Sequence, residues 1–575
     1  MKTNIIILMA LAALSLPSCR DYLDEIPDSR ITVDTDDEVK ALLNSAYPNC
    51  TFVRVTELAS DNADDLNGEA NGYYDRFSEQ CFSWEEVTES DNESPTMIWQ
   101  GYYSAIGAAN HALKALDEMG GADTDTRRAL RGEALLCRAY AHFMLVNIFC
   151  QNYSKAHSST DLGVPYATEP ETTLDPKYER GTVAGTYEKI EKDLLEGLSL
   201  INDAIYTVPR YHFNTKAAYT FASRFYLFYQ QPEKVIEYAT KALGDNPESL
   251  MRDYAAMATM PTDDMQPRSI QYTSSSEKAN FLLLPVYSTD QYYFTGTETG
   301  SRFNNNSYIA QAEQFFLTPW APDNEAAMQS QAIFNFYWFY TSVYNKCMFP
   351  KQPIYFEEVN TNTHTGYQRT LVVALKAEEA LLNRAEAYAL TNQPELALKD
   401  INVWTDNFVA DSVSYNTYEY DENWNYIYAT EPINKHLTME RIRQWAEAYD
   451  YYTPMVPRPR KHLNPEWTTL TEGSDQENLL QCILLMRRLE FLHEGMRWFD
   501  IKRYGIKIYR RRIITALNAM ELTDSMEYRD PRQAIQIPFE VSSAGMQPNP
   551  RNENSSMPEY ARWNNKMTQL NFNKR

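Results

Sequence analysis

The amino-acid sequence predicts a mainly α-helical protein in which a scaffold of helix pairs carries a large loop-rich subregion. Three observations support this fold class. Apolar residues recur at helical spacing, one kind of turn between two helices occurs twice, and long polar stretches separate the helices. The chain has 575 residues, which is longer than a single hydrophobic core usually supports. We therefore expect two or more packed subregions.

Helical periodicity is clearest where small and apolar residues step by three and four positions. Ala134, Cys137 and Ala141 form one such face, and their small side chains allow a neighbouring helix to approach closely. Similar faces recur along the chain and predict further helices. We expect helix pairs at about 94–150, 182–230, 215–245, 373–408 and 438–504.

Two of the expected helices lead into related turns. Gln231-Pro232-Glu233 follows one helix and Gln393-Pro394-Glu395 follows another, and a second amphipathic stretch follows each turn. Proline at the start of a helix, with glutamate in the first turn, is favourable N-terminal chemistry. The repeated unit resembles tetratricopeptide repeats, so we expect a tetratricopeptide-like scaffold whose repeats need not be contiguous.

Long stretches rich in Asn, Thr, Ser, Gly and Tyr lie between the helices. Compact domains rarely contain structureless loops of such length unless the loops have a function. We interpret these stretches as inserted loops that together form a ligand-binding subregion. They are found at about 59–93, 151–180, 260–370 and 409–435.

The N-terminus has the layout of a bacterial export signal. A lysine precedes an apolar run that is shorter than the roughly 20 residues needed to span a bilayer. Leu16-Pro17-Ser18-Cys19 then resembles the lipobox of bacterial lipoproteins. We expect residues 1–18 to be a lipoprotein signal peptide, Cys19 to carry the lipid anchor, and residues 19–575 to be the mature protein. The acidic run 20–25 resembles the signal that sends Bacteroidetes lipoproteins to the outer face of the outer membrane.

Charge and cysteine content exclude several partners and cofactors. The formal net charge is −25, so we expect no nucleic-acid partner, since phosphate binding requires clustered cations. The short basic run 458–461 is expected to be a solvated loop. The cysteines show no CxxC pairing, so we expect no zinc site, no cofactor and few or no disulfides. Cys137 and Cys482 fall in apolar helical stretches and are expected to be core residues.

A dense block of charged and aromatic residues, 486–505, lies near the C-terminus and is called the signature block below. Arg487 and Glu490, like Arg497 and Asp500, are spaced so that they can pair along a helix. We interpret the block as a buried or half-buried ion network that joins helices, rather than as a catalytic site. It closely resembles the signature of SusD-like (RagB) outer-membrane lipoproteins.

The resemblance to SusD-like proteins extends over essentially the whole chain. Leu130-Arg131-Gly132-Glu133-Ala134 and Arg138-Ala139-Tyr140 resemble the family's second helix. Gly163-Val164-Pro165-Tyr166 resembles the turn that follows this helix, and Asp530-Pro531-Arg532 resembles part of the terminal segment. Asn549-Pro550-Arg551 departs from the usual ending of the family, although only in turn geometry.

The resemblance implies a cell-surface protein that captures oligosaccharides or other nutrients and is not an enzyme. Such proteins sit over the mouth of a partner TonB-dependent, SusC-like β-barrel in the outer membrane and deliver the ligand for import. Their helical repeats face the barrel, whereas the loop-rich half holds the ligand. We therefore expect a protein that is lipid-anchored to the outer membrane and faces the extracellular side.

Sugar binding requires flat aromatic faces flanked by amide, carboxylate or arginine groups. Two of the predicted loops offer this combination, although packing against the scaffold explains any one of their aromatic residues equally well. The candidate ligand-binding residues are Asp61, Asn62, Tyr73, Tyr74 and Trp84 in the first loop, and Tyr292, Tyr293, Arg302, Asn305 and Trp320 in the second.

Two other classes of function stay open. A helical-repeat scaffold that assembles only with other proteins fits the helices but leaves the aromatic loops unexplained. A glycoside hydrolase needs a carboxylate pair, and acidic residues are numerous enough to supply one. However, the sequence contains no Gly-rich phosphate loop, no HExxH and no GxSxG motif. The choice between a glycan and a peptide ligand, and the presence of structural calcium, also stay open.

Overall fold

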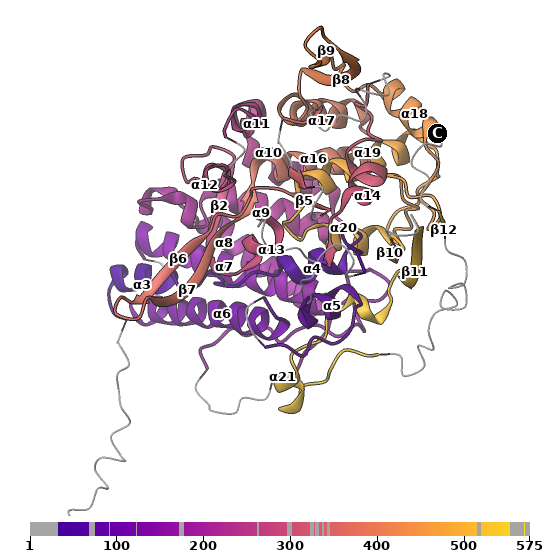
Figure 1. Ribbon diagram of the computed structural model, residues 1–575. Coiled ribbons are helices and arrows are strands. Elements are labelled where there is room, and N and C mark those ends of the chain that lie inside the picture. The colour runs from indigo at the N-terminus through magenta and orange to yellow at the C-terminus, as the bar shows by residue number, and fades with distance from the viewer. Residues whose placement is uncertain are drawn as a thin grey trace, which may run out of the picture.

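Figure 1 shows the computed structural model of the chain, in which helices rise in a stack from α6 to α17 and strands lie on either flank. Cys19, Tyr73 and Tyr74 lie outside the residues that the structure describes, as do residues 1–18. The described residues are 33–67, 75–90, 93–121, 123–171, 178–261, 264–295, 302–322, 327, 333–335, 339–341, 345–514, 519–551 and 568–569.

The scaffold consists of antiparallel helix pairs that pack on one another in chain order. The prediction of a mainly α-helical, tetratricopeptide-like scaffold is confirmed. Its helices are α6 (Pro95–Glu118), α7 (Asp125–Phe149), α8 (Val183–Leu200), α9 (Thr215–Phe228), α10 (Pro232–Leu243), α16 (Ala377–Leu390) and α17 (Pro394–Phe408).

The repeated turn forms as predicted. Pro232 and Pro394 occupy the first turn of α10 and α17, where a missing N–H leaves no hydrogen bond unmade. Gln230 and Asn392 lie two residues after the ends of α9 and α16, and their φ angles are +62° and +56°. A left-handed residue at this position turns the chain back sharply, so that the two helices of each pair pack antiparallel.

Side-chain size explains how closely the long helices approach. A Cβ atom built on Gly132 of α7 would lie 3.0 Å from the backbone nitrogen of Ile201, and one on Gly197 of α8 would lie 2.8 Å from Leu136. Larger rings fill the next layer, where Phe143 meets several aromatic residues of α9 edge-on. Small residues therefore set the α7–α8 distance, and aromatic residues fill the space beside it.

Further helices come before, between and after the scaffold helices along the chain. They are α3 (Asp36–Leu43), α4 (Val53–Ala59), α5 (Arg76–Phe82), α11 (Tyr254–Ala258), α12 (Gln266–Tyr272), α13 (Asp290–Thr295), α14 (Ser307–Ile309), α18 (Met439–Ala448), α19 (Asp475–Glu490), α20 (Arg497–Tyr504) and α21 (Phe539–Ser543). Within the described part of the chain, none of the helices combines the length and the apolar character needed to cross a membrane.

Four small sheets complete the fold, with orders β12-β11-β10-β1-β3, β2-β7-β6, β4-β5 and β8-β9. Neighbouring strands are antiparallel except β1 and β10. The strands are β1 (Asp64–Asp65), β2 (Asn280–Tyr287), β3 (Phe303–Asn304), β4 (Phe339–Thr341), β5 (Lys346–Met348), β6 (Tyr355–Asn360), β7 (Thr365–Lys376), β8 (Ser412–Tyr420), β9 (Tyr426–Pro432), β10 (Ile508–Ile514), β11 (Ala519–Met526) and β12 (Thr568–Gln569).

Two stretches that the sequence analysis treats as structureless loops contain regular strands. The region 260–370 provides β2, β6 and the first half of β7, and the region 409–435 folds almost entirely into the β8–β9 hairpin. Residues 373–376, which the sequence predicts as helix, are the end of β7, and the strand continues directly into α16. β-Branched and aromatic residues are frequent in β7, β8 and β9, and this enrichment is a strand signal that the polar residues around them conceal.

The six described cysteines are all buried and unpaired. Cys137 and Cys482 are core residues, as predicted, and both are in the single large hydrophobic cluster that runs through the scaffold.

Candidate functional site

The signature block forms the end of α19, a turn and α20, and its charged side chains are buried. Arg487 donates to both carboxylate oxygens of Asp500, at 2.9 and 3.1 Å. Arg503 donates to Asp500 at 2.6 Å and to Glu386 on α16 at 2.7 Å. The block therefore joins α16, α19 and α20 through ion pairs, as the sequence predicts.

The same ion pairs extend to the N-terminal part of the chain. Arg497 forms a two-pronged pair with Asp61, in which both distances are 2.8 Å. Arg488 donates to the side-chain oxygen of Asn62 at 2.8 Å and to Glu313 at 3.1 Å. Residues more than 400 positions apart in the sequence are thus held together by charge-assisted hydrogen bonds.

We call this set of side chains the charge lattice. Burial raises the free energy of each carboxylate, but Lys461, Arg511 and Arg488 outweigh this cost and lower the pKa of Glu313 to about 2. The members of the lattice are Asp61, Glu313, Glu386, Lys461, Arg487, Arg488, Arg497, Asp500, Arg503 and Arg511.

The predicted pairs within the signature block and the predicted solvation of the basic run are wrong. Arg487 pairs with Asp500, not with Glu490, because α20 folds back against α19 and brings Asp500 beside it. Arg497 pairs with Asp61, not with Asp500. Arg460 and Lys461 of the basic run are not solvated, since both side chains are buried. Lys461 lies 2.5 Å from Glu313, and Arg460 donates to the carbonyl oxygen of Ala446 at 2.6 Å.

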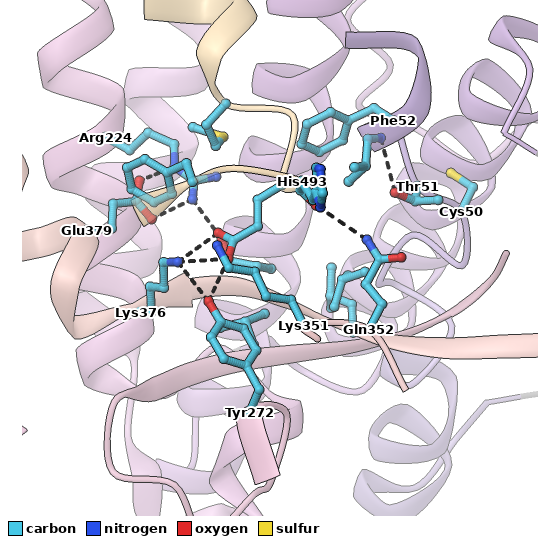
Figure 2. A pocket seen from close by; sticks show the side chains of 18 of the residues that line it. Cys50, Thr51, Phe52, Arg224, Tyr272, Lys351, Gln352, Lys376, Glu379 and His493 are labelled. Atoms are coloured by element: carbon cyan, nitrogen blue, oxygen red, sulfur yellow. Dashed lines mark hydrogen bonds and ion pairs between the residues drawn. The ribbon is translucent and has the colours of Figure 1, made fainter. Parts of the chain in front are cut away.

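A cavity of about 50 Å³ lies beside the charge lattice (Figure 2). Lys376 donates to Tyr272 at 3.0 Å and to both oxygens of Glu494, at 2.9 and 2.7 Å. Lys351 donates to the carbonyl oxygen of Leu492 at 3.0 Å, and its ammonium lies 3.0 Å from Glu494. Burial opposes ionisation of Glu494, but the two lysines lower its pKa to about 2.

This cavity is too small for an oligosaccharide. Ligand pockets usually measure about 300–1,000 Å³, whereas a volume near 50 Å³ suits one or two water molecules. The lysines on its wall already contact carboxylate and carbonyl oxygens. Figure 2 shows the bond from Lys376 to the hydroxyl of Tyr272. We therefore interpret the cavity as part of the packing around the signature block, not as the ligand surface.

Among the described residues predicted in the first loop, Asn62 and Trp84 are buried, and only 10% of the Asp61 side chain is exposed. Asp61 belongs to the charge lattice, and Asn62 accepts a hydrogen bond from Arg488 of the lattice. Trp84 donates its indole N–H to the carbonyl oxygen of Ala59 at 2.9 Å, and the guanidinium of Arg510 lies 3.9 Å from its ring centroid. Ion pairing and packing explain all three positions, so we leave them out of the candidate surface.

Most of the predicted residues of the second loop are also interior. Trp320 has no exposed area and packs against Trp404, with ring centroids 5.8 Å apart. Tyr293 is buried under the guanidinium of Arg54. Arg302 forms a two-pronged pair with Asp65, at 2.6 and 2.8 Å. Asn305 is buried, and both polar atoms of its side chain lack a hydrogen-bond partner among the described residues.

Tyr292 is the exposed member of the predicted set. Its hydroxyl donates to the side-chain oxygen of Gln368 on β7, at 3.5 Å. Gln368 lies between Tyr367 and Arg369 in the strand, so its side chain is on the opposite face of the sheet from theirs.

The face of the β2–β7–β6 sheet that carries Arg369 holds a row of side chains. Strand register pairs Arg369 with both Tyr287 and Tyr355, which places the three side chains in one row across the sheet. Tyr367 lies two residues before Arg369 and therefore faces the same side.

We call the surface formed by Tyr287, Tyr355, Glu357, Tyr367 and Arg369 the aromatic platform. The guanidinium of Arg369 lies 4.0 Å from the ring centroid of Tyr287 and donates to the hydroxyl of Tyr287 at 2.6 Å. Arg369 also pairs with Glu357. The rings of Tyr287 and Tyr367 meet edge to face, with centroids 5.5 Å apart. The platform thus combines aromatic faces with one cation and one carboxylate, all fixed by strand register.

The platform has the chemistry that sugar recognition requires. Aromatic faces cover the apolar side of a sugar ring, and arginine and carboxylate groups bond its hydroxyls. None of the platform residues is in the predicted set, because Tyr292, the exposed predicted residue, lies outside the platform. Tyr355 and Glu357 are two positions apart, as are Tyr367 and Arg369, and this spacing puts side chains on one face of a strand.

Metal binding has no preformed site in the described part of the chain. No group of three or more His, Cys, Asp and Glu side chains there is arranged to hold a metal ion.

Two family descriptions match the sequence. A SusD-like family described as "Starch-binding associating with outer membrane" matches residues 21–227, and the SusD family (SusD/RagB) matches residues 289–570. No curated protein matches the chain.

Solved structures of SusD proteins share the fold over nearly the whole chain. A SusD superfamily protein from Bacteroides thetaiotaomicron superposes with a TM-score of 0.58 at 18% identity, covering 90% of this chain and 100% of its own. A SusD-like carbohydrate binding protein from Bacteroides vulgatus gives 0.55 at 16% identity, covering 89% and 96%. A SusD superfamily protein from Bacteroides fragilis gives 0.56 at 15% identity, covering 89% and 98%.

Proposed function

The chain belongs to the SusD family, and on this basis we propose that it binds a glycan and delivers it to a SusC-like, TonB-dependent transporter. The aromatic platform is the observation that carries the proposal, because it presents aromatic rings, an arginine and a carboxylate on one sheet face. The similar structure from Bacteroides vulgatus, a carbohydrate binding protein, supports the same class of ligand.

The proposed location is the extracellular side of the outer membrane. The family description associates its members with that membrane. Cys19 at the lipobox would supply the anchor, and the family relation supports a SusC-like barrel as the partner. A substitution Cys19→Ala should release the protein from washed outer membranes, and protease added to intact cells should degrade the anchored protein.

Affinity electrophoresis in gels that contain soluble neutral polysaccharides tests glycan binding. We expect the wild-type protein to be retarded by at least one polysaccharide, and the double variant Tyr355→Ala/Tyr367→Ala to lose this retardation. Phe539→Ala is the matched control, since Phe539 is an exposed aromatic residue on α21, away from the platform. All three proteins should melt at the same temperature, because the substituted rings are exposed.

The alternatives predict different outcomes. If the wild-type protein is retarded by no polysaccharide from a broad panel, the glycan proposal fails and a peptide becomes the favoured class of ligand. A pure assembly scaffold would copurify with the barrel whether or not a glycan is bound. A glycoside hydrolase would release reducing ends from a retained polysaccharide, and we expect no such release.

A further inference from the structure

The β8–β9 hairpin is a projecting element that the proposed function does not use. It follows α17 directly and forms a sheet of its own, at the top of the molecule in Figure 1 and far from β6 and β7. Val413 and Ile433 are buried and fix its base. Beyond the base, every residue from 418 to 428 is exposed, so the outer half of the hairpin packs on nothing else among the residues that the structure describes.

This outer half carries a cluster of aromatic rings. Tyr420 and Tyr426 are paired across the strands, with ring centroids 4.7 Å apart, and Trp424 lies 6.0 Å from Tyr420. Tyr428 follows Tyr426 by two residues and therefore faces the same side. Trp424 is 83% exposed and Tyr428 is 65% exposed. Most of each ring surface thus stays in contact with water, which is unfavourable unless another apolar surface covers it.

The backbone at the tip holds these rings in an uncommon conformation. Tyr418 and Trp424 have φ angles of +60° and +64°, values that bulky residues rarely adopt. The side chain of Asp421 accepts hydrogen bonds from the backbone N–H groups of Asn423 and Asn425, both at 2.8 Å. The backbone N–H of Trp424 donates to the carbonyl oxygen of Asp421 at 3.0 Å. Asp421 therefore builds the turn that presents Trp424, and such local strain is typical of functional sites.

The charge of the hairpin restricts what can cover the rings. Residues 412–432 contain no lysine or arginine, whereas their acidic residues are Glu419, Asp421, Glu422 and Glu431. An anionic lipid surface or an anionic polysaccharide would be repelled. A neutral, hydroxyl-rich chain suits the hairpin better, because the rings cover the apolar faces of its sugars and the carboxylates accept hydrogen bonds from its hydroxyls.

We propose that the β8–β9 hairpin is a second glycan-contact element, which binds neutral polysaccharide chains with Tyr420, Trp424, Tyr426 and Tyr428. This inference rests on the proposed function, because it assigns the hairpin the same class of ligand as the aromatic platform. The two elements flank one helix pair: β7 enters α16, and β8 leaves α17. Since α16 and α17 are antiparallel, the hairpins start at the same end of the pair. A long chain that touches both gains from linked binding, and a short oligosaccharide does not.

The test compares long and short ligands in one assay. Wild type, Tyr420→Ala/Trp424→Ala/Tyr428→Ala and the platform variant are measured against soluble neutral polysaccharides (glucans, mannans and xylans) and against their hexasaccharides. We expect the hairpin variant to bind the polysaccharide about 10-fold more weakly, and to bind the hexasaccharide as the wild type does. The variant Asp421→Ala keeps the rings but loses the turn, and we expect it to weaken polysaccharide binding in the same direction.

The outcomes separate this inference from the proposed function. If the wild-type protein binds no neutral glycan, the proposed function fails, and this inference fails with it. If the platform variant loses binding while the hairpin variant binds every polysaccharide as the wild type does, the hairpin inference alone is wrong. Loss of copurification with the barrel, or of binding to phosphatidylcholine vesicles, in the hairpin variant with unchanged glycan binding would overturn it in favour of a protein or a membrane contact.

Discussion

Two arginine–glutamate–tyrosine clusters in this chain use the same side chains in opposite environments. In the charge lattice, Glu386 accepts from Arg503 and from the hydroxyl of Tyr504, both at 2.7 Å, and its side chain has no exposed area. On the aromatic platform, Arg369 pairs with Glu357 and lies over Tyr287, and 45% of the Glu357 side chain is exposed.

The difference shows why identical chemistry serves stability in one place and suits recognition in the other. Buried charges must be paired, because an unpaired charge in the interior costs several kcal/mol. Removing one partner from the buried cluster should therefore destabilise the fold. The exposed cluster can exchange its partners for water or for ligand hydroxyls at little cost. The two environments therefore predict opposite responses to the same substitution.

The largest difference in the free energy of unfolding is expected between Arg503→Met and Arg369→Met. Arg503→Met leaves Glu386 buried with a lost partner and should lower the free energy of unfolding by about 3–5 kcal/mol. Arg369→Met breaks an exposed pair and should change it by less than about 1 kcal/mol while weakening glycan binding. Urea unfolding of both variants measures the contrast, and similar losses in both would show that exposure does not decide the role of these clusters.

Acid should remove the stability that the buried carboxylates provide. Glu313 and Glu494 have pKa values near 2 in the folded protein, below the value of 4.5 for a free glutamate. The unfolded chain thus binds these protons first, so the stability they provide is complete above pH 4.5 and is lost as the pH falls towards 2. Thermal melts between pH 7 and pH 3 measure the loss.

A variant identifies the groups responsible for this pH dependence. Glu313→Gln should be less stable at pH 7 and should show a flatter decline in acid than the wild type. Glu440→Gln is the control, because Glu440 is exposed on α18. An unchanged slope in Glu313→Gln would mean that other carboxylates dominate acid unfolding.

Among the buried positions, the smallest loss of stability is expected at a glycine of the signature block. Gly495 has a φ of +74°, and a Cβ atom there would lie 2.4 Å from the hydroxyl of Thr56. Gly495→Ala should lower stability by about 1–3 kcal/mol through strain and crowding together. Gly473 has a φ of +77° with nothing within 4 Å, so Gly473→Ala measures the strain alone. Equal melting temperatures of the two variants would rule out crowding at Gly495.

Local sequence patterns predict the helices well because each helix is largely specified by its own residues. The turns at Pro232 and Pro394 and the stepping of small residues on α7 determine pairs that form as expected. The signature block is also predicted as an ion network. Its partners are not predicted, because Asp61 meets Arg497 only after the two ends of the chain pack together.

The site is predicted less well for a related reason. Polar neighbours in the sequence suggest that Trp84 and Trp320 are accessible, but only the fold shows that Arg510 covers one and Trp404 packs on the other. The aromatic platform and the β8–β9 hairpin are missed as structured elements because their composition resembles that of loops. The spacing of their residues is visible in the sequence. Which side chains meet across neighbouring strands depends on the register, which only the sheet supplies.

The junction between β7 and α16 has a mechanical consequence. Lys376, the last residue of β7, is fixed by Tyr272 and Glu494. The strand is also paired with β2 from Arg369 to Lys376, so only residues 365–368 extend beyond β2. This part of the β6–β7 hairpin is a cantilever of roughly 13 Å, supported at its root by β2. A force applied at its tip would therefore bend the end of the sheet before it reached the helices.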